Sequence, residues 1–309
     1  MSMSFFAISG LLNAIISSFF GVFVYLKNRG NKINQTFALM CLSIVLWSFP
    51  YYLWQIATNE KSALLWSRGL MIGAIFIPVT YLHFILSFLE KDQEKKRFIF
   101  LSYIVAFIFL FSNFTSLFVK NVVPELYFSF WPKPGIFYHP FLLMFFCYVT
   151  YGCYLLFVAY KKSVGIKRFQ IGYLLLPTII GFGGGATNYF LWYGIPIPPY
   201  GNILIILFPF FITLAILKYH LFEIRVILTE ILVGLMGIIL LILPFLMPTP
   251  NLRILTILVL ILFCIFGYYL VKTTHEESKR REEAERMAVR ERALRLRTER
   301  LTGQGSSFC

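Results

Sequence analysis

Side chains that could do chemistry are scarce in this sequence, and most of them lie near the ends of long apolar stretches. Glu230 is the only acidic residue well inside such a stretch, and His83 lies inside another, where a packing role is favoured over a proton relay. No arrangement resembles a Ser/His/Asp triad, a cluster of metal ligands or a nucleotide-binding glycine box. The sequence therefore predicts no catalytic site, metal site or cofactor. The scarcity of titratable groups also argues against an ion-coupled transporter.

Two connecting segments combine prolines with aromatic residues, Lys120–Pro140 and the segment from Trp192 to Asn202. One interpretation is an aromatic belt at the membrane interface with prolines in the turns. The other is a rigid, apolar-walled mouth for a small hydrophobic or amphiphilic ligand. The candidate ligand-binding residues, all near the outer ends of their stretches, are Tyr51, Trp54, Gln55, Trp66, Arg68, Asn113, His139, Asn188, Trp192 and Tyr193.

Nine apolar stretches of about 20 residues position these side chains. At a rise of about 1.5 Å per residue, each is long enough to cross a hydrocarbon layer of about 30 Å as a helix. We therefore expect an all-α, polytopic membrane bundle of about nine transmembrane helices. The stretches are Phe5–Leu26, Thr36–Ala57, Gly69–Leu89, Phe98–Val119, Phe141–Tyr160, Phe169–Leu191, Ile203–Leu217, Val226–Leu246 and Ile254–Val271.

The placement of positive charge predicts the orientation. The chain has 28 Lys and Arg residues, and basic residues in short loops favour the cytoplasmic side. With nine spans and the N-terminus outside, all of them are cytoplasmic except Lys61, Arg68, Lys120, Lys133 and Arg253. We expect a multi-pass protein of the bacterial cytoplasmic (inner) membrane with a cytoplasmic C-terminus. Membrane lipid is a sufficient partner for the net charge of +14, so nucleic acid is not expected.

A charged segment, Lys272–Leu301, follows the last stretch. It holds 10 basic and 7 acidic residues and no glycine or proline, and several acid–base pairs four residues apart favour a cytoplasmic helix. A thin apolar seam leaves two alternatives open, a solvated single helix or a weak coiled-coil homodimer. Residues 302–309 read as a disordered or truncated end. The seam comprises Ala284, Met287, Leu294 and Leu301.

Three segments of the first seven stretches resemble the N-terminal seven-transmembrane sensor region of bacterial histidine kinases. They run from Arg68 to Phe84, from Asn188 to Pro199, with its Gly-Ile-Pro-Ile-Pro turn, and from Ala215 to Ile224. The resemblance covers roughly residues 5–225. It implies a signal-sensing membrane block coupled to cytoplasmic phospho-acceptor and ATP-binding modules of a two-component system.

The sequence departs from that family pattern in two respects. An extra hairpin, Val226–Val271, follows the seven-span block, and the catalytic modules are absent. His275-Glu276 begins like a phospho-acceptor box, but Glu277 and Arg280 stand where an apolar residue and a proline are usual. We therefore expect this chain not to be an enzyme itself, although the full-length protein is expected to be a histidine kinase.

The expected organisation is a sensor domain (1–225), a transmembrane hairpin (226–271), the charged helix (272–301) and the end segment (302–309). The leading hypothesis is a sensor region that passes an extracellular or intramembrane stimulus to a cytoplasmic output domain. A non-catalytic facilitator or lipid-handling transporter, or a structural docking subunit, is the alternative. The expected signal exit comprises Lys218, Tyr219, His220, Glu223, Arg225 and Glu230.

Overall fold

The computed structural model describes residues 5–217, 224–246 and 250–305. It is 81% helical, and the expectation of an all-α, polytopic helical bundle is confirmed. The elements are α1 (Phe5–Lys27), α2 (Lys32–Gln55), α3 (Glu60–Phe88), α4 (Lys96–Asn113), β1 (Val119–Glu125), β2 (Phe128–Pro134), α5 (Tyr138–Lys162), α6 (Gly165–Ala186), α7 (Asn188–Trp192), the 3₁₀ segment η1 (Tyr200–Ile206), α8 (Leu207–Leu217), α9 (Ile224–Leu246) and α10 (Pro250–Gly305).

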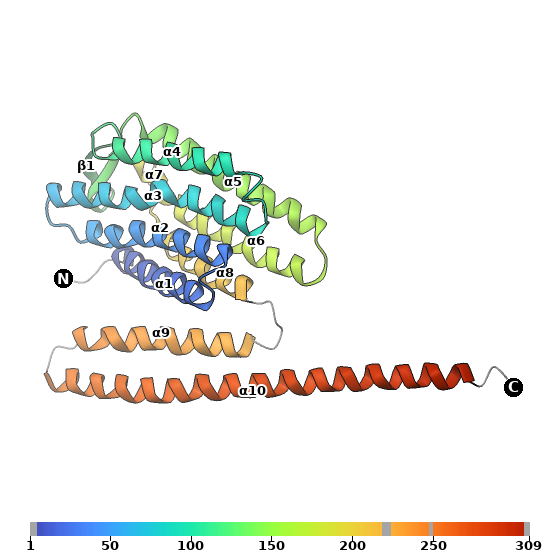
Figure 1. The fold of residues 1–309 in the computed structure, drawn as a ribbon. Helices are drawn as coiled ribbons and strands as arrows, with labels where there is room; N and C mark the ends of the chain where they lie inside the picture. Colours follow the sequence, from blue (N-terminus) through green and yellow to red (C-terminus); the bar gives the residue numbers. More distant parts are fainter. Residues whose placement is uncertain (1–4, 218–223, 247–249, 306–309) are drawn as a thin grey trace. The chain divides into compact units, whose positions relative to one another are not determined.

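The chain divides into two compact units, Met1–Ile216 and Leu217–Cys309. In the first unit α3 is the central helix: it packs against α2, α4 and α5, and α1 packs on the other side of α2 (Figure 1). In the most apolar part of α3, 72% of the residues are buried, against 22% in α4 and in α5. The outward faces of α4 and α5 are nevertheless apolar, with Phe111 72% and Leu143 67% exposed. Such faces suit a lipid environment rather than water.

Seven helices in the described residues are long and apolar enough to cross a membrane, six in the first unit and one at the start of α10. The other two of the nine expected spans contain shorter apolar helices, Tyr200–Ile216 and Thr229–Ile238. The seventh expected span is therefore not one regular helix. It begins with a 3₁₀ turn, η1, and continues as the 11 residues of α8.

The second unit is a helical hairpin in which α9 packs against the first part of α10. A Cβ on Gly267 would lie 2.7 Å from Val233 Cγ1, so the small residue lets the two helices approach closely. The ninth expected span and the charged segment form one helix of 56 residues. The expectation that the charged segment is helical is thus met from Lys272 through Leu301.

Close contact between α2 and α3 depends on Gly73. A Cβ at this position would lie 2.2 Å from the Trp47 backbone nitrogen and 2.5 Å from the Ser43 carbonyl oxygen. Both neighbours are backbone atoms of α2, so a side chain at residue 73 can only be accommodated if the helices move apart. Small residues at such crossings are the usual means of close helix packing in membranes.

Substitution Gly73→Ala should therefore destabilise the first unit by about 1–3 kcal/mol or more, the cost of overpacking a core. Gly183→Ala is the matched control, because nothing lies within 4 Å of a Cβ added on that glycine of α6. Equilibrium unfolding in detergent measures both variants. Equal stability of the two would contradict the assigned α2–α3 contact.

Candidate functional site

A β-hairpin not expected from the sequence covers one end of the first unit, here called the hairpin end. β1 and β2 pair antiparallel, with Val123 opposite Trp131. Leu126 makes the turn with a φ of 53°, in the left-handed region. The hairpin occupies most of the Pro- and aromatic-rich segment Lys120–Pro140, and it is why α4 ends at Asn113 rather than continuing to Val119.

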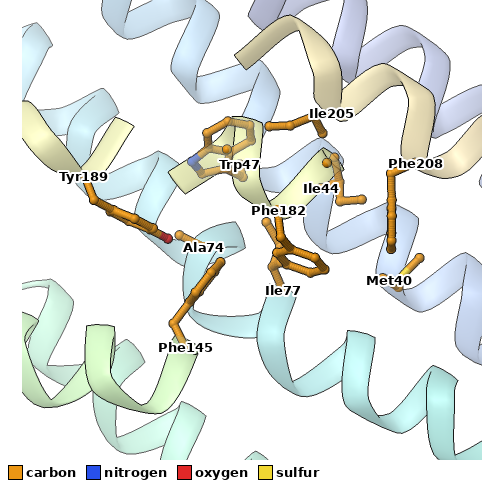
Figure 2. A pocket seen from close by; sticks show the side chains of 12 residues that line it. Met40, Ile44, Trp47, Ala74, Ile77, Phe145, Phe182, Tyr189, Ile205 and Phe208 are labelled. Carbon is orange, nitrogen blue, oxygen red and sulfur yellow. The ribbon is translucent and has the colours of Figure 1, made fainter. Parts of the chain in front are cut away.

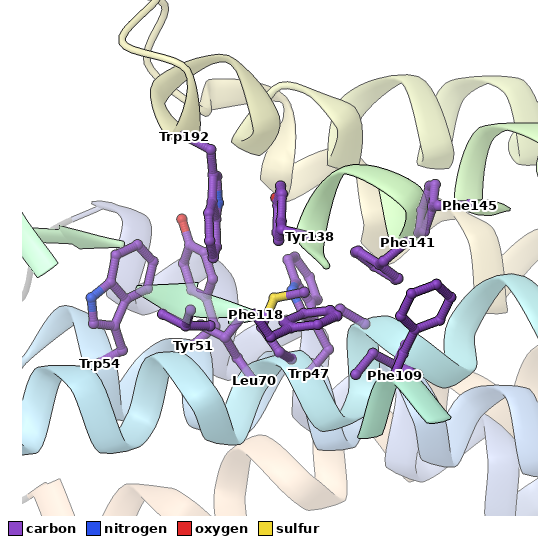
Figure 3. Close-up of a cluster of buried hydrophobic side chains, with 14 of the residues drawn as sticks. Trp47, Tyr51, Trp54, Leu70, Phe109, Phe118, Tyr138, Phe141, Phe145 and Trp192 are labelled. Atoms are coloured by element: carbon purple, nitrogen blue, oxygen red, sulfur yellow. The ribbon is translucent and has the colours of Figure 1, made fainter. Parts of the chain in front are cut away.

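Trp54 of α2 lies in a cluster of buried, mostly aromatic side chains (Figure 3) and connects the hairpin to α2. Trp131 is fully buried, and its ring centroid lies 4.8 Å from that of Trp54 in an edge-to-face arrangement. Trp54 Nε1 also donates a hydrogen bond of 2.7 Å to the Phe130 carbonyl oxygen. A buried tryptophan usually finds a partner for its indole N–H, and Trp54 does so here, whereas the buried Trp131 Nε1 has no hydrogen-bond partner in the described residues. Trp54 therefore packs against β2 and also fixes its orientation.

Below the hairpin lies a cavity of about 230 Å³. The Trp54 and Gln55 side chains, both expected ligand residues, form part of its wall at the end of α2. The rest of the wall is mostly aromatic and comes from α1, the segment after α2, the hairpin turn and β2. The lining residues are Phe6, Trp54, Gln55, Ala57, Tyr127, Phe128, Ser129 and Phe130.

Two smaller cavities follow, each of which shares wall residues with the one before it. Trp54 separates the first from a cavity of about 30 Å³, which is also lined by the expected residues Tyr51, Asn188 and Trp192. That second cavity shares the walls Trp47, Ala74, Gly185 and Tyr189 with a third of about 50 Å³. Figure 2 shows the third cavity between α2, α3, α5, α6 and α8, with Phe145, Phe182 and Phe208 around it.

Arg68 and Asn113 connect helices rather than lining these cavities. Asn113 Nδ2 donates a 2.8 Å hydrogen bond to the Arg68 carbonyl oxygen. The Arg68 guanidinium in turn donates to the carbonyl oxygens of Phe114 and Val119, at 3.4 and 3.3 Å. A cation beside the free carbonyls at the C-terminus of α4 is favourable. This pair holds α3, α4 and the start of β1 together.

The remaining expected residues are His139 and Tyr193, which contact each other, and Trp66, which lies elsewhere. His139 Nδ1 lies 2.9 Å from the Tyr193 hydroxyl, so this pair connects α5 to the segment after α7. Partial burial raises the pKa of Tyr193, so its hydroxyl stays protonated. Trp66 is half-buried and packs against the hydrophobic core from α3. His83, considered for packing or proton relay, lies 3.1 Å from the Tyr103 hydroxyl and joins α3 to α4.

A buried polar network, absent from the expected site, joins the 3₁₀ segment η1 to α1 and α7. Asn13 Nδ2 donates to the Asn202 carbonyl oxygen at 3.0 Å, and Asn202 Nδ2 donates to Ser9 Oγ at 2.9 Å. Asn188 Nδ2 donates to Asn202 Oδ1 at 3.1 Å. Asn13 and Asn202 are fully buried. Asn188, one of the expected ligand residues, therefore lines a cavity and also takes part in this structural network through Asn202.

Sequence reasoning missed the residues that the hairpin contributes, above all Tyr127, Phe128, Phe130 and Trp131. The alternation Phe-Ser-Phe-Trp after Leu126 is the local signal that could have indicated a strand. Lys218, Tyr219, His220 and Glu223 of the expected signal exit lie outside the described residues. Arg225 and Glu230 belong to α9.

The hairpin turn keeps a neutral hydroxyl at the cavity. Partial burial and a hydrogen bond with Tyr200 raise the pKa of Tyr127 to about 12. Its ring stacks on Phe6 with centroids 5.9 Å apart. Tyr127 and Gln55 both line the cavity, and each carries an uncharged side chain that can donate and accept a hydrogen bond.

Apolar helices of membrane-spanning length, packed around aromatic cavities, define the class of this molecule as a polytopic helical membrane protein. A protein-family model described as the N-terminal 7TM region of histidine kinase matches residues 10–227. The chain belongs to this family, and it is a membrane sensor region of a histidine kinase. The resemblance found in the sequence is thereby confirmed. No curated protein and no solved structure matches the chain.

Replacing Trp54 by Phe should loosen the hairpin. The variant keeps a ring against Trp131 but leaves the Phe130 carbonyl without its indole donor, a loss worth about 1–3 kcal/mol when the group is buried. Amide hydrogen exchange over β1 and β2 should become faster, and Trp66→Phe, on α3, is the control. Unchanged exchange in the Trp54 variant would show that the hydrogen bond does not hold the hairpin.

The raised pKa of Tyr127 predicts a titration at high pH. Because the folded-state pKa lies above the ordinary value of about 10, folding favours the neutral phenol. This contribution to stability is complete below pH 10 and is lost as the pH rises through about 12. The difference in tyrosinate absorbance between the wild type and Tyr127→Phe should have its midpoint above the ordinary pKa of about 10. A midpoint near the ordinary value would contradict the described surroundings of the hydroxyl.

Proposed function

We propose that this chain receives the stimulus of a two-component sensor histidine kinase and passes it to a cytoplasmic output domain. Family membership supports the sensor role. The distribution of basic residues supports a bacterial cytoplasmic membrane, with the hairpin end outside and the end of α10 in the cytoplasm. In this proposal the membrane region binds and transmits, and phosphoryl transfer belongs to the output domain.

The stimulus we propose is a small hydrophobic or amphiphilic molecule that binds below the hairpin. The observation that carries this proposal is the 230 Å³ cavity, whose lining residues are mostly aromatic and include the polar residues Gln55, Tyr127 and Ser129. Ligand sites typically pair an apolar lining with a few placed polar groups. The volume lies below the roughly 300–1,000 Å³ of pockets for drug-sized molecules, so the ligand is correspondingly small.

Binding there would act on the packing between the hairpin, α1 and the end of α2. A ligand whose affinity for two packings differs about tenfold biases them by about 1.4 kcal/mol, enough for a partial change in output. The output would pass through α9 and α10, and we propose a homodimer along the seam of α10 as the partner that reads it. Membrane lipid is the other proposed partner.

The test uses the full chain joined in frame to a histidine-acceptor helix and an ATP-binding domain, reconstituted in liposomes. Octanol serves as a small amphiphilic probe, and the rate of autophosphorylation is measured with and without it. The wild type should change its rate, whereas Ala57→Trp, which fills the cavity, should not respond. Leu65→Trp introduces the same side chain at a position of α3 that is 62% exposed, and it should respond as the wild type does.

The control separates binding from a general effect on the bilayer. An equal response of all three proteins would mean that octanol acts through the lipid, which contradicts the proposed site. No response in any of them would contradict octanol-like amphiphiles as the ligand class.

A further inference from the structure

Another apolar hollow, far along α6 from the hairpin end, lies beside a strongly basic turn. It is a groove of about 900 Å³ between the end of α5, residues 165–180 of α6 and the start of α8. Its walls include Phe169, Tyr173 and Leu176 of α6 and Phe211 of α8. All the residues that line it belong to the first unit.

The groove exists because α6 and the segment after it meet at one point and diverge from there. A Cβ on Gly184 would lie 2.3 Å from the Gly201 carbonyl oxygen, so α6 and η1 touch through their backbones. Toward the start of α6 the helices separate, and only large rings reach across. Tyr173 and Phe211 stack with centroids 6.5 Å apart and an interplanar angle of 25°.

Four basic residues, here called the basic turn, surround the α5–α6 connection: Lys161, Lys162, Lys167 and Arg168. All four are exposed, and the Arg168 guanidinium stacks over the Tyr160 ring at 4.7 Å, at the edge of the groove. The sequence contains no Asp or Glu between Glu125 and Glu223, so no acidic side chain of that long stretch can neutralise the turn. Positive charge at the mouth of an apolar groove is complementary to an anionic amphiphile.

The length of the groove matches one leaflet of a bilayer. Twelve residues separate Arg168 from Ile180, the far limit of the lining on α6. At about 1.5 Å per residue this is roughly 18 Å, slightly more than half of a hydrocarbon layer of about 30 Å. An acyl chain with its head at the basic turn would therefore lie along the groove at the depth it already has in the membrane.

We infer that this groove binds an anionic phospholipid, with the phosphate at the basic turn and an acyl chain between α6 and α8. Tyr160 holds Arg168 over the mouth by cation–π stacking, which keeps the guanidinium available for the phosphate. The glycine at position 172 leaves the floor of the groove free, since a Cβ there would meet only the Tyr160 ring, at 3.5 Å. This lipid site is independent of the ligand proposed below the hairpin.

Native mass spectrometry of the full chain tests the inference. The protein is released from micelles that contain phosphatidylglycerol and phosphatidylcholine in equal amounts, and the bound lipids are counted for each variant. The wild type should retain phosphatidylglycerol in preference. Arg168→Gln should reduce that preference about fivefold, the effect of one basic residue near an anionic surface. Lys96→Gln, which removes the same charge at the start of α4 outside the groove, should leave it unchanged.

A second pair of variants tests the acyl part of the site. Gly172→Leu places a side chain in the groove and should abolish retention of the lipid, whereas Gly183→Leu, in open space on the same helix, should not. Equal retention of the two lipids by the wild type would overturn the inference. So would undiminished retention by Gly172→Leu, or a wild-type dimer that this substitution separates, which would assign the groove to a second copy of the chain.

Discussion

A single buried amide, Asn202, determines how the segment from Tyr200 to Ile216 passes through the first unit. Backbone polar groups in an apolar environment must be satisfied within the protein, and a 3₁₀ turn satisfies them less well than an α-helix. η1 compensates because Asn202 is bonded through its carbonyl oxygen, its amide nitrogen and its amide oxygen to Asn13, Ser9 and Asn188. The irregular segment is therefore held by two other elements, α1 and α7. The backbone contact between Gly184 and Gly201, and with it the divergence of α6 from α8, depends on that position.

The same segment contributes wall residues to two of the spaces in the first unit. Ile205 of η1 and Phe208 of α8 line the 50 Å³ cavity, while Leu207 and Phe211 line the basic-turn groove. Neighbouring residues of one short segment thus face two different spaces. A shift of η1 would therefore change both spaces, and it would have to break the buried hydrogen bonds of Asn202.

The sequence was sufficient for the features that depend on local composition. Apolar length predicted the helices, and the family resemblance rested on three segments of that helical part. The hairpin was not predictable from apolar length. Its two short strands are stabilised by a contact with Trp54 of α2, which is distant in the sequence, so the strands themselves show no long apolar run. Asn202 and Asn13 lie 189 residues apart, and no spacing rule could pair them. Arg68 and Asn113 were expected to bind a ligand because they are polar side chains near a membrane surface. Their hydrogen bonds to backbone carbonyls instead show that they hold structural elements together.

The continuity of α10 has a geometric consequence for whatever follows it. From Pro250 to Gly305 the backbone is one helix of 56 residues, without an internal turn that could absorb a change. Each residue therefore has a fixed angular position relative to the apolar part of the same helix. Inserting one residue within the charged portion would rotate everything beyond it by about 100°, whereas inserting seven would restore the original direction to within about 20°. The number of residues in α10, more than their identity, therefore sets the direction that the far end of the helix faces.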